Sequence, residues 1–217
     1  RLQNLGSPTD LHLADANRVS ARVASDAVTL PDECYVILHD VRLRGLVEMD
    51  DDPTVVALLD AGLVARARTA LRITVEGRDL HTAWARVPVG SDAEQVATRA
   101  YEQFLDLNRE LIRICHDWQV RPGDVPNDHG DVRYDWAVID RLRGLDERTH
   151  PVVRRLGRDV ERFTPYPTRL RTALVQVEEG EAAWLTSPRI DSYHTVWMQL
   201  HEDLLLALGI ERASEPE

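Results

Sequence analysis

Apolar residues recur every three to four positions over long stretches of this chain, which predicts helices as its main elements. The clearest stretch covers residues 92–119, where apolar side chains form one stripe of the helical wheel and the polar Asn108 falls within it. Ser91 followed by Glu94 has the spacing of a capping box, so we expect this helix to begin at Asp92. The stripe consists of Ala97, Tyr101, Phe104, Leu111, Ile112 and Cys115.

Prolines and glycines separate further helical stretches on both sides of this long helix. We expect a last helix to start at Asp191 or Ser192 and to end at Leu208, with Gly209 at its C-terminal cap. A loop rich in Pro, Gly and Asp is expected at residues 121–133. The other predicted helices cover residues 8–27, Cys34–Leu46, Thr54–Ala61, Tyr134–Leu145, Pro151–Phe163 and Thr168–Glu178.

The segment Gly62–Trp84 follows a different pattern: a strand, a short turn, a second strand that ends in Thr-Val-Glu-Gly, and then a helix. This order is typical of the wing of a helix-turn-helix domain. Gly90 and Ser91 form the best candidate domain boundary. We therefore expect a mostly α fold, with a winged-helix-like domain and an N-terminal arm at residues 1–90, and a C-terminal bundle of about five helices at residues 91–217.

The charge of the chain gives DNA little long-range attraction, because the net charge is −11. Residues 41–91 are the least acidic part, and arginines there can pair with phosphates. Reading bases needs polar or cationic side chains on the second helix, where only Thr54 and Asp60 are available. A DNA-binding regulator and a winged helix that serves only for packing or dimerisation both fit. The candidate DNA contacts are Arg42, Arg44, Arg66, Arg68 and Arg72.

The last helix carries His194 and His201 on one flank of its apolar stripe. They are one heptad apart, roughly 10 Å along the axis, which is too far for both to bind one metal ion. Together with Trp197 they could line a pocket and act as hydrogen-bonding or acid–base groups. Half-buried histidines that hydrogen-bond to neighbouring helices fit the same pattern.

A second polar group surrounds the loop after the long helix. Its carboxylates do not have the spacing of a calcium loop, and we expect no metal site. If the loop returns the chain, these side chains converge with the last helix on a site between helices; otherwise they cap helices and face solvent. The candidate ligand-binding residues are Asn108, His116, Asp117, Trp118, Asn127, Asp128, His129, Tyr193, His194, Trp197 and His201.

Several stretches resemble known proteins. Leu43–Gly45, the Leu-Leu-Asp-Ala-Gly-Leu-Val run that ends at Val64, and Ile73–Arg78 resemble the winged-helix half of MarR-type regulators over about 45 residues. Over most of its length the chain is similar to an actinobacterial family of two-part proteins labelled as transcriptional regulators. The segments that carry this second resemblance are Asp117–Gln119, Asn127–His129 with Asp131, Ser192–Trp197 and Leu200–Asp203.

These patterns favour a ligand-responsive DNA-binding transcriptional regulator that forms a homodimer. The alternative is an enzyme or small-molecule-binding protein with a degenerate winged helix as scaffold and a His/Asp/Trp-lined site in the C-terminal helices. No known catalytic signature occurs, so the sequence assigns neither a catalytic residue nor a cofactor. No apolar run is long enough to cross a membrane, and Cys34 and Cys115 fit buried thiols in a reducing cytosol. We therefore expect a cytoplasmic protein without a membrane partner.

Overall fold

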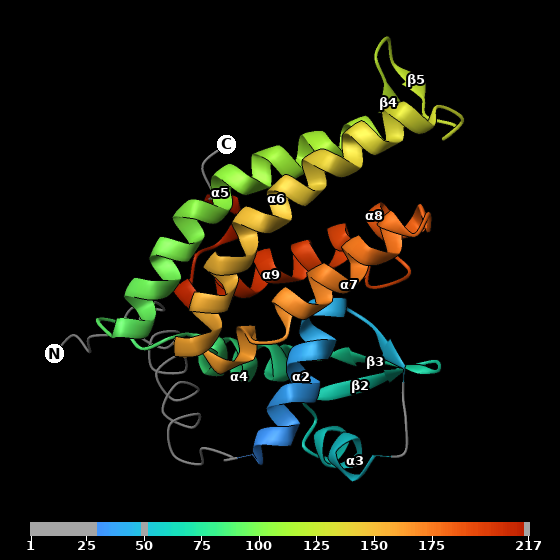
Figure 1. The fold of residues 1–217 in the computed structure, drawn as a ribbon. Coiled ribbons are helices and arrows are strands. Elements are labelled where there is room, and N and C mark those ends of the chain that lie inside the picture. The colour runs from blue at the N-terminus through green and yellow to red at the C-terminus, as the bar shows by residue number, and fades with distance from the viewer. Residues whose placement is uncertain (1–29, 49–51, 215–217) are drawn as a thin grey trace, which may run out of the picture.

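The computed structural model of the 217-residue chain describes residues 30–48 and 52–214, and helices make up most of that part (Figure 1). The prediction of a mostly α fold is confirmed. The helix expected at residues 8–27 lies outside the described residues. Figure 1 shows two long helices lying along each other, two further helices beneath them, and a smaller half with a sheet at the base.

The smaller half holds a three-stranded antiparallel sheet in the order β1-β3-β2. Strand β3 is central: Leu71 lies opposite Val47 on one side and Arg66 on the other. Leu71 is fully buried, so the face of the sheet that carries it packs against the helices of the same half. In chain order the elements are α2 (Asp32–Arg44), β1 (Val47–Glu48), α3 (Pro53–Asp60), β2 (Val64–Ala67), β3 (Ala70–Ile73) and α4 (Val75–Ala85).

Local signals set the ends of these elements. Asp52 caps α3 through the backbone N–H of Thr54, and Pro53 occupies its first position, where a missing N–H costs nothing. Thr74 accepts a hydrogen bond from the Gly77 N–H and donates from its hydroxyl to the Leu63 carbonyl. The strand therefore ends at Ile73 and α4 begins at Val75, so Val75, Glu76 and Gly77, which the sequence pattern placed at the end of the strand, belong to the helix.

The larger half begins with α5, whose predicted bounds of 92–119 are confirmed. Ser91 accepts from the Glu94 N–H, and the Glu94 carboxylate reaches back to the N–H of Gly90. The last helix, α9, is capped by Ser192 and ends at Gly209 in the left-handed conformation, both as predicted. The elements are α5 (Asp92–Gln119), β4 (Val120–Arg121), β5 (Val125–Pro126), α6 (Val132–Asp159), η1 (Glu161–Phe163), α7 (Tyr166–Glu178), α8 (Ala183–Thr186), α9 (Tyr193–Leu208) and η2 (Arg212–Ser214).

One expectation about this half is wrong, and the structure adds a detail to another. The segments expected as two helices, Tyr134–Leu145 and Pro151–Phe163, are joined in one helix, α6, which ends at Asp159, and Glu161–Phe163 form the separate η1. Pro151 lies inside it, since packing of the buried face against α5 offsets the lost backbone hydrogen bond. The expected loop at residues 121–133 contains a small hairpin of β4 and β5, which projects from the far end of α5 and α6 (Figure 1).

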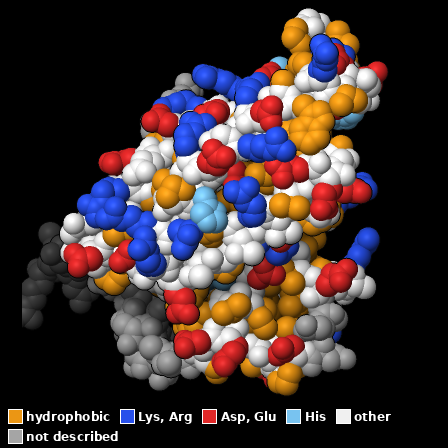
Figure 2. Space-filling view, viewed as in Figure 1, with side chains coloured by type: hydrophobic (Ala, Val, Ile, Leu, Met, Phe, Trp, Pro, Cys, Tyr) orange, Lys and Arg blue, Asp and Glu red, His pale blue; other side chains and the backbone are white. Residues whose placement is uncertain are grey.

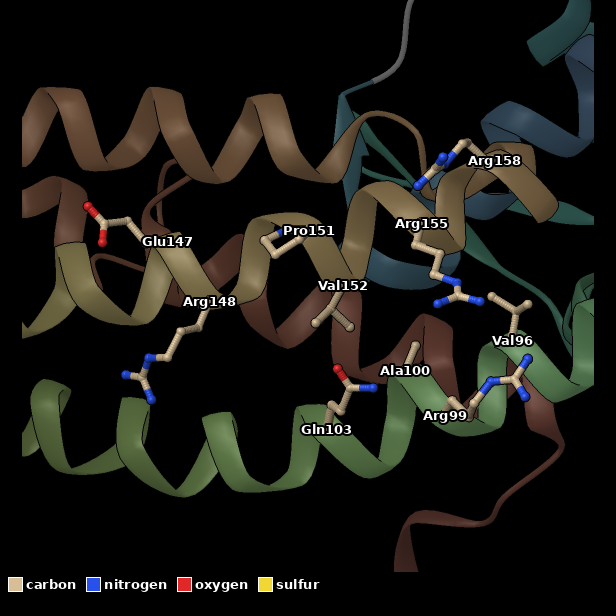
Figure 3. A pocket seen from close by; sticks show the side chains of 10 residues that line it. All are labelled: Val96, Arg99, Ala100, Gln103, Glu147, Arg148, Pro151, Val152, Arg155 and Arg158. Atoms are coloured by element: carbon tan, nitrogen blue, oxygen red, sulfur yellow. The ribbon is translucent and has the colours of Figure 1, made fainter.

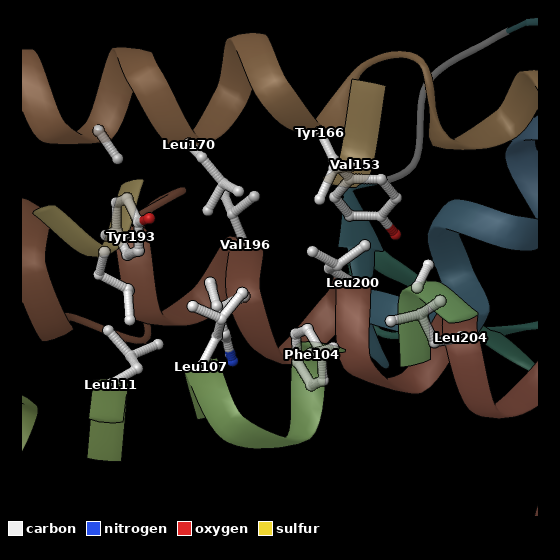
Figure 4. Packing of buried hydrophobic residues seen from close by; sticks show 14 of the residues in the cluster. Phe104, Leu107, Leu111, Val153, Tyr166, Leu170, Tyr193, Val196, Leu200 and Leu204 are labelled. Atoms are coloured by element: carbon white, nitrogen blue, oxygen red, sulfur yellow. The ribbon is translucent and has the colours of Figure 1, made fainter. Parts of the chain in front are cut away.

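Two separate hydrophobic cores form, one in each half. The smaller core contains Leu38, Leu58 and Leu71, all without exposed surface. The larger core lies between α5, α6, α7 and α9 (Figure 4). In this core Trp197 stacks on Phe104 with ring centroids 4.7 Å apart. Stacked aromatic rings add to the free energy of burial, so this pair anchors α9 against α5.

We predict opposite effects of alanine at two glycines. A Cβ on Gly77 would lie 1.9 Å from the Leu63 carbonyl oxygen, whereas a Cβ on Gly144 in α6 meets nothing within 4 Å. Gly77→Ala should lower the free energy of unfolding by about 2 kcal/mol or more, because backbone must move. Gly144→Ala should raise it by about 0.5–1 kcal/mol through helix propensity. Urea denaturation measures both; equal effects would contradict the close approach of Gly77 to the Leu63 backbone.

Candidate functional site

The five predicted DNA-contacting arginines occupy two different places. Arg66, Arg68 and Arg72 are exposed on the β2–β3 hairpin. Arg68 occupies the turn with a φ of 58°, a left-handed conformation that is uncommon for a residue with a side chain. The hairpin therefore presents three guanidinium-bearing side chains to solvent.

Arg42 and Arg44 instead face the larger half of the molecule. Arg42 Nη2 lies 2.7 Å from Glu202 Oε1 of α9, and Arg44 Nη1 lies 2.8 Å from Asp191 Oδ1. Arg44 also pairs with Asp40 on its own helix. These two guanidinium groups are occupied by carboxylates at the junction between the halves, so we do not count them among the side chains available to phosphate.

Helix α3 offers no cation to a partner. Its exposed positions are Pro53, Val56, Ala57 and Asp60, while Val55 and Leu58 are buried in the smaller core. This distribution follows from the sequence, since the helix contains no arginine.

The predicted ligand-binding residues separate into three groups. The first lies inside the larger core: Trp197 donates from Nε1 to Asn108 Oδ1 at 2.9 Å, and Tyr193 donates to Asp146 Oδ1 at 3.3 Å. Burial raises the pKa of Tyr193 well above its usual value. His201 packs against the ring of Phe104 with centroids 4.9 Å apart. Asn108 thus has a structural partner, which explains a polar residue in an apolar stripe.

The second group lies at the β4–β5 end of α5. The His129 ring packs at a tilt against Trp118, and its Nδ1 lies 3.1 Å from Asp135 Oδ2. Asn127 donates to the Trp118 carbonyl and to Asp135, which fixes the loop on the helix end. The remaining residues of the group are surface residues: the side chain of His116 is 62% exposed, Asp117 pairs with Arg141, and Asp128 caps the Gly130 N–H.

The third group consists of His194 alone, which is half-buried in a groove between α9 and the end of α2. Burial lowers the pKa of His194 below its usual value. The groove has a volume of about 620 Å³, and Met198 and Thr195 line it beside His194. The structure therefore does not bring Asn108, His116, His129, His194 and His201 to one site, as one interpretation of the sequence supposed.

A cluster that the sequence did not indicate lies at the junction of the two halves. Asp203 of α9 has no exposed surface and accepts from Arg162 Nε at 2.7 Å and from the Tyr166 hydroxyl at 3.3 Å. His39 of α2 places Nε2 3.3 Å from the same carboxylate. The other ring nitrogen of His39, Nδ1, lies 2.9 Å from Nε2 of the buried His81.

Hydrogen bonding fixes the orientation of this chain of groups. When His39 is neutral, its Nε2–H faces Asp203, so its Nδ1 accepts a hydrogen bond from the Nε2–H of His81. Nδ1 of His81 is buried and has no hydrogen-bond partner among the described residues. The Trp84 ring lies against both imidazoles, with centroids 5.7 and 5.5 Å away.

The charges of the cluster follow from burial and pairing. Burial would raise the pKa of Asp203, but hydrogen bonds from His39 and Arg162 outweigh it and lower that pKa below its usual value. Burial, and then the neighbouring His39, lower the pKa of His81 to about 3. At neutral pH the cluster therefore contains an ionised carboxylate next to Arg162 and a neutral His81.

Comparisons with known proteins add no assignment: a scan against protein-family models, a search of curated proteins and a search of solved structures found no match. Within residues 30–48 and 52–214, no three His, Cys, Asp or Glu side chains gather in a way that could hold a metal ion. In the same ranges, no helix combines the length and apolar character needed to span a membrane.

The low pKa of His81 predicts a specific loss of stability in acid. Its ordinary value is 6.5, so the unfolded chain takes up a proton first as the pH falls. The free energy of unfolding that the neutral His81 contributes is fully present above pH 6.5 and is lost as the pH falls toward 3. Between pH 7 and pH 5 the loss in the free energy of unfolding amounts to about 2 kcal/mol. His81→Gln should remove most of this pH dependence in urea denaturation.

The matched control is His116→Gln, because that imidazole is largely exposed. The control should keep the pH dependence of the original chain. If His81→Gln showed the same loss between pH 7 and 5 as the control, the assignment of a neutral buried His81 would be wrong.

Proposed function

We propose that this chain is a winged-helix regulator of the MarR-like kind that binds DNA chiefly through its β2–β3 hairpin. The observation that carries the proposal is the order helix, strand, helix, strand, strand, helix in residues 32–85, with the sheet order β1-β3-β2. In winged-helix domains a recognition helix is followed by a two-stranded hairpin, the wing, and α3, β2 and β3 stand in that order along this chain. The exposed arginines of that hairpin support contact with phosphates.

The side chains of α3 support a wing-led mode of binding. In helix-turn-helix proteins the second helix contacts base edges with polar or cationic side chains. The exposed face of α3 consists of Pro53, Val56, Ala57 and Asp60, which supply neither charge complementarity nor bidentate donors. We therefore propose that affinity comes from backbone contacts of the wing, with weak discrimination between DNA sequences.

The junction supports regulation of the wing by the helical half. Strand β3 leads directly into α4, and α4 carries His81 and Trp84 into the polar cluster around Asp203. A ligand that shifts α7 or α9 would change the partners of His39 and with them the orientation of the wing. Formation of a homodimer remains a prediction of the sequence.

An enzymatic function of the C-terminal helices has less support. An enzymatic site in these helices needs His194 and His201 to face the same space. In the structure His201 packs in the core against Phe104, whereas His194 borders the surface groove. A general base needs an imidazole that substrate can reach. We therefore place the regulator first.

The proposed function predicts that DNA affinity depends on the hairpin. The triple variant Arg66→Gln, Arg68→Gln and Arg72→Gln should bind the duplex upstream of the chain's own coding region more weakly. Each lost phosphate contact should lower the slope of log K against log salt concentration by about 0.9. Fluorescence anisotropy with labelled duplex at several salt concentrations measures both quantities.

A control variant with the same net charge separates local contacts from the overall field. Arg113→Gln, Arg133→Gln and Arg189→Gln removes three exposed arginines that lie outside the hairpin. It should keep the salt slope of the original chain. Equal slopes for the hairpin and control variants, or no DNA binding by the original chain at low salt, would refute the proposal.

A further inference from the structure

A groove between α5 and α6 gathers arginines on a molecule that is otherwise acidic. It has a volume of about 590 Å³ and lies where the N-terminal part of α5 faces the C-terminal part of α6. Four arginines line it, together with one carboxylate, that of Glu147. Figure 2 shows basic side chains spread over the helical half, in contrast to the acidic and apolar side chains toward the base of the view. The four are Arg99, Arg148, Arg155 and Arg158.

Most of these guanidinium groups lack a carboxylate partner. Arg148 pairs with Glu110 at 2.7 Å, but no hydrogen bond or ion pair to another described residue is formed by the side chains of Arg99, Arg155 or Arg158. Several other arginines of the chain are paired, among them Arg141, Arg162 and Arg169. Guanidinium groups held together repel one another, and Glu147 supplies the one carboxylate of the lining, so this groove gains free energy when an anion enters.

The side chains converge from two helices. Figure 3 shows Arg99 of α5 and Arg155 of α6 reaching toward the same end of the groove, next to Val96. Arg158 follows one turn later on α6 and continues the basic surface around that helix toward Arg154 and Arg171. Two guanidinium forks on facing helices match an anion with oxygens on more than one centre, because each fork can hold one group.

The rest of the lining points to an organic ligand. Val96, Ala100, Pro151 and Val152 give one wall apolar character, and the Gln103 amide offers both a donor and an acceptor. The volume lies in the usual range for small-molecule pockets. A free inorganic ion would leave the apolar part of the groove unused.

We propose that this groove binds a small organic molecule that carries a diphosphate group, with Arg99 and Arg155 as the principal phosphate contacts. This inference rests on the proposed function in one respect, that the helical half receives a regulatory ligand. The groove and the junction between the halves are also close along the chain. Helix α6 ends one turn after Arg155, and η1, which follows, carries the Arg162 that donates to Asp203. A ligand bound in the groove would therefore reduce the motion of the C-terminal end of α6, which lies next to the cluster around Asp203 that positions α4.

Isothermal titration calorimetry of the full chain with inorganic pyrophosphate, without DNA or divalent metal, tests the site. Arg99→Gln with Arg155→Gln should raise the dissociation constant at least about tenfold, since each lost charge-assisted hydrogen bond contributes that much. The control, Arg113→Gln with Arg133→Gln, also removes one exposed arginine from α5 and one from α6. Its dissociation constant should stay within about twofold, and orthophosphate should bind the original chain more weakly than pyrophosphate.

Three outcomes would overturn the proposal: no pyrophosphate binding by the original chain, equal losses in the groove and control variants, or orthophosphate binding as tightly as pyrophosphate. A fourth is a groove variant that loses binding of duplex DNA while the hairpin variant keeps it, since the groove would then be a nucleic-acid surface. The calorimetry contains no DNA, so pyrophosphate binding by a chain that fails to bind DNA would remove the regulator and keep this site.

Discussion

The position of the smaller half depends on one buried carboxylate. Removing an ionised Asp203 from water costs several kcal/mol unless partners replace the lost hydration. Arg162 of η1, Tyr166 of α7 and His39 of α2 supply those partners. Arg162 and Tyr166 share the larger half with Asp203, and His39 is the one of these three partners that comes from the smaller half. The contact between His39 and Asp203 therefore ties the docking of the two halves to this carboxylate.

This arrangement also orders the groups next to it. Burial and the neighbouring His39 keep His81 neutral, and Asp203 orients His39. The Trp84 ring packs against both imidazoles. Arg42 and Arg44 add ion pairs at the periphery, where solvent weakens each of them. The β2–β3 hairpin is attached directly to α4, so the cluster around Asp203 sets the orientation of the proposed DNA-contacting surface through α4.

Local signals made much of the fold predictable from the sequence. The ends of α5 and α9 depend on Ser91, Ser192 and Gly209, whose hydrogen bonds and backbone conformation are formed within a few residues. The break expected at Pro151 was wrong, because packing against α5 decides whether a helix tolerates a proline and that packing is not a local property.

The candidate site was predictable only in part, for the same reason. The exposed arginines of the hairpin follow from a strand pattern. The sequence placed Asn108 in an apolar stripe and predicted a ligand contact, whereas the structure pairs it with Trp197. The cluster around Asp203 joins residues 39, 81, 162, 166 and 203, and no spacing in the sequence links them. An acidic residue at a core position of the last helix was the one available signal.

The most direct measurement of this account is amide hydrogen exchange of the Asp203→Asn variant beside the original chain. The substitution keeps the shape of the side chain and removes the charge that Arg162 and His39 face. The account predicts faster exchange in α2 and α4, with protection of α5 and α6 unchanged, because only the docking of the smaller half is lost. Unchanged exchange in α2 and α4, or an equal increase across all helices, would contradict it.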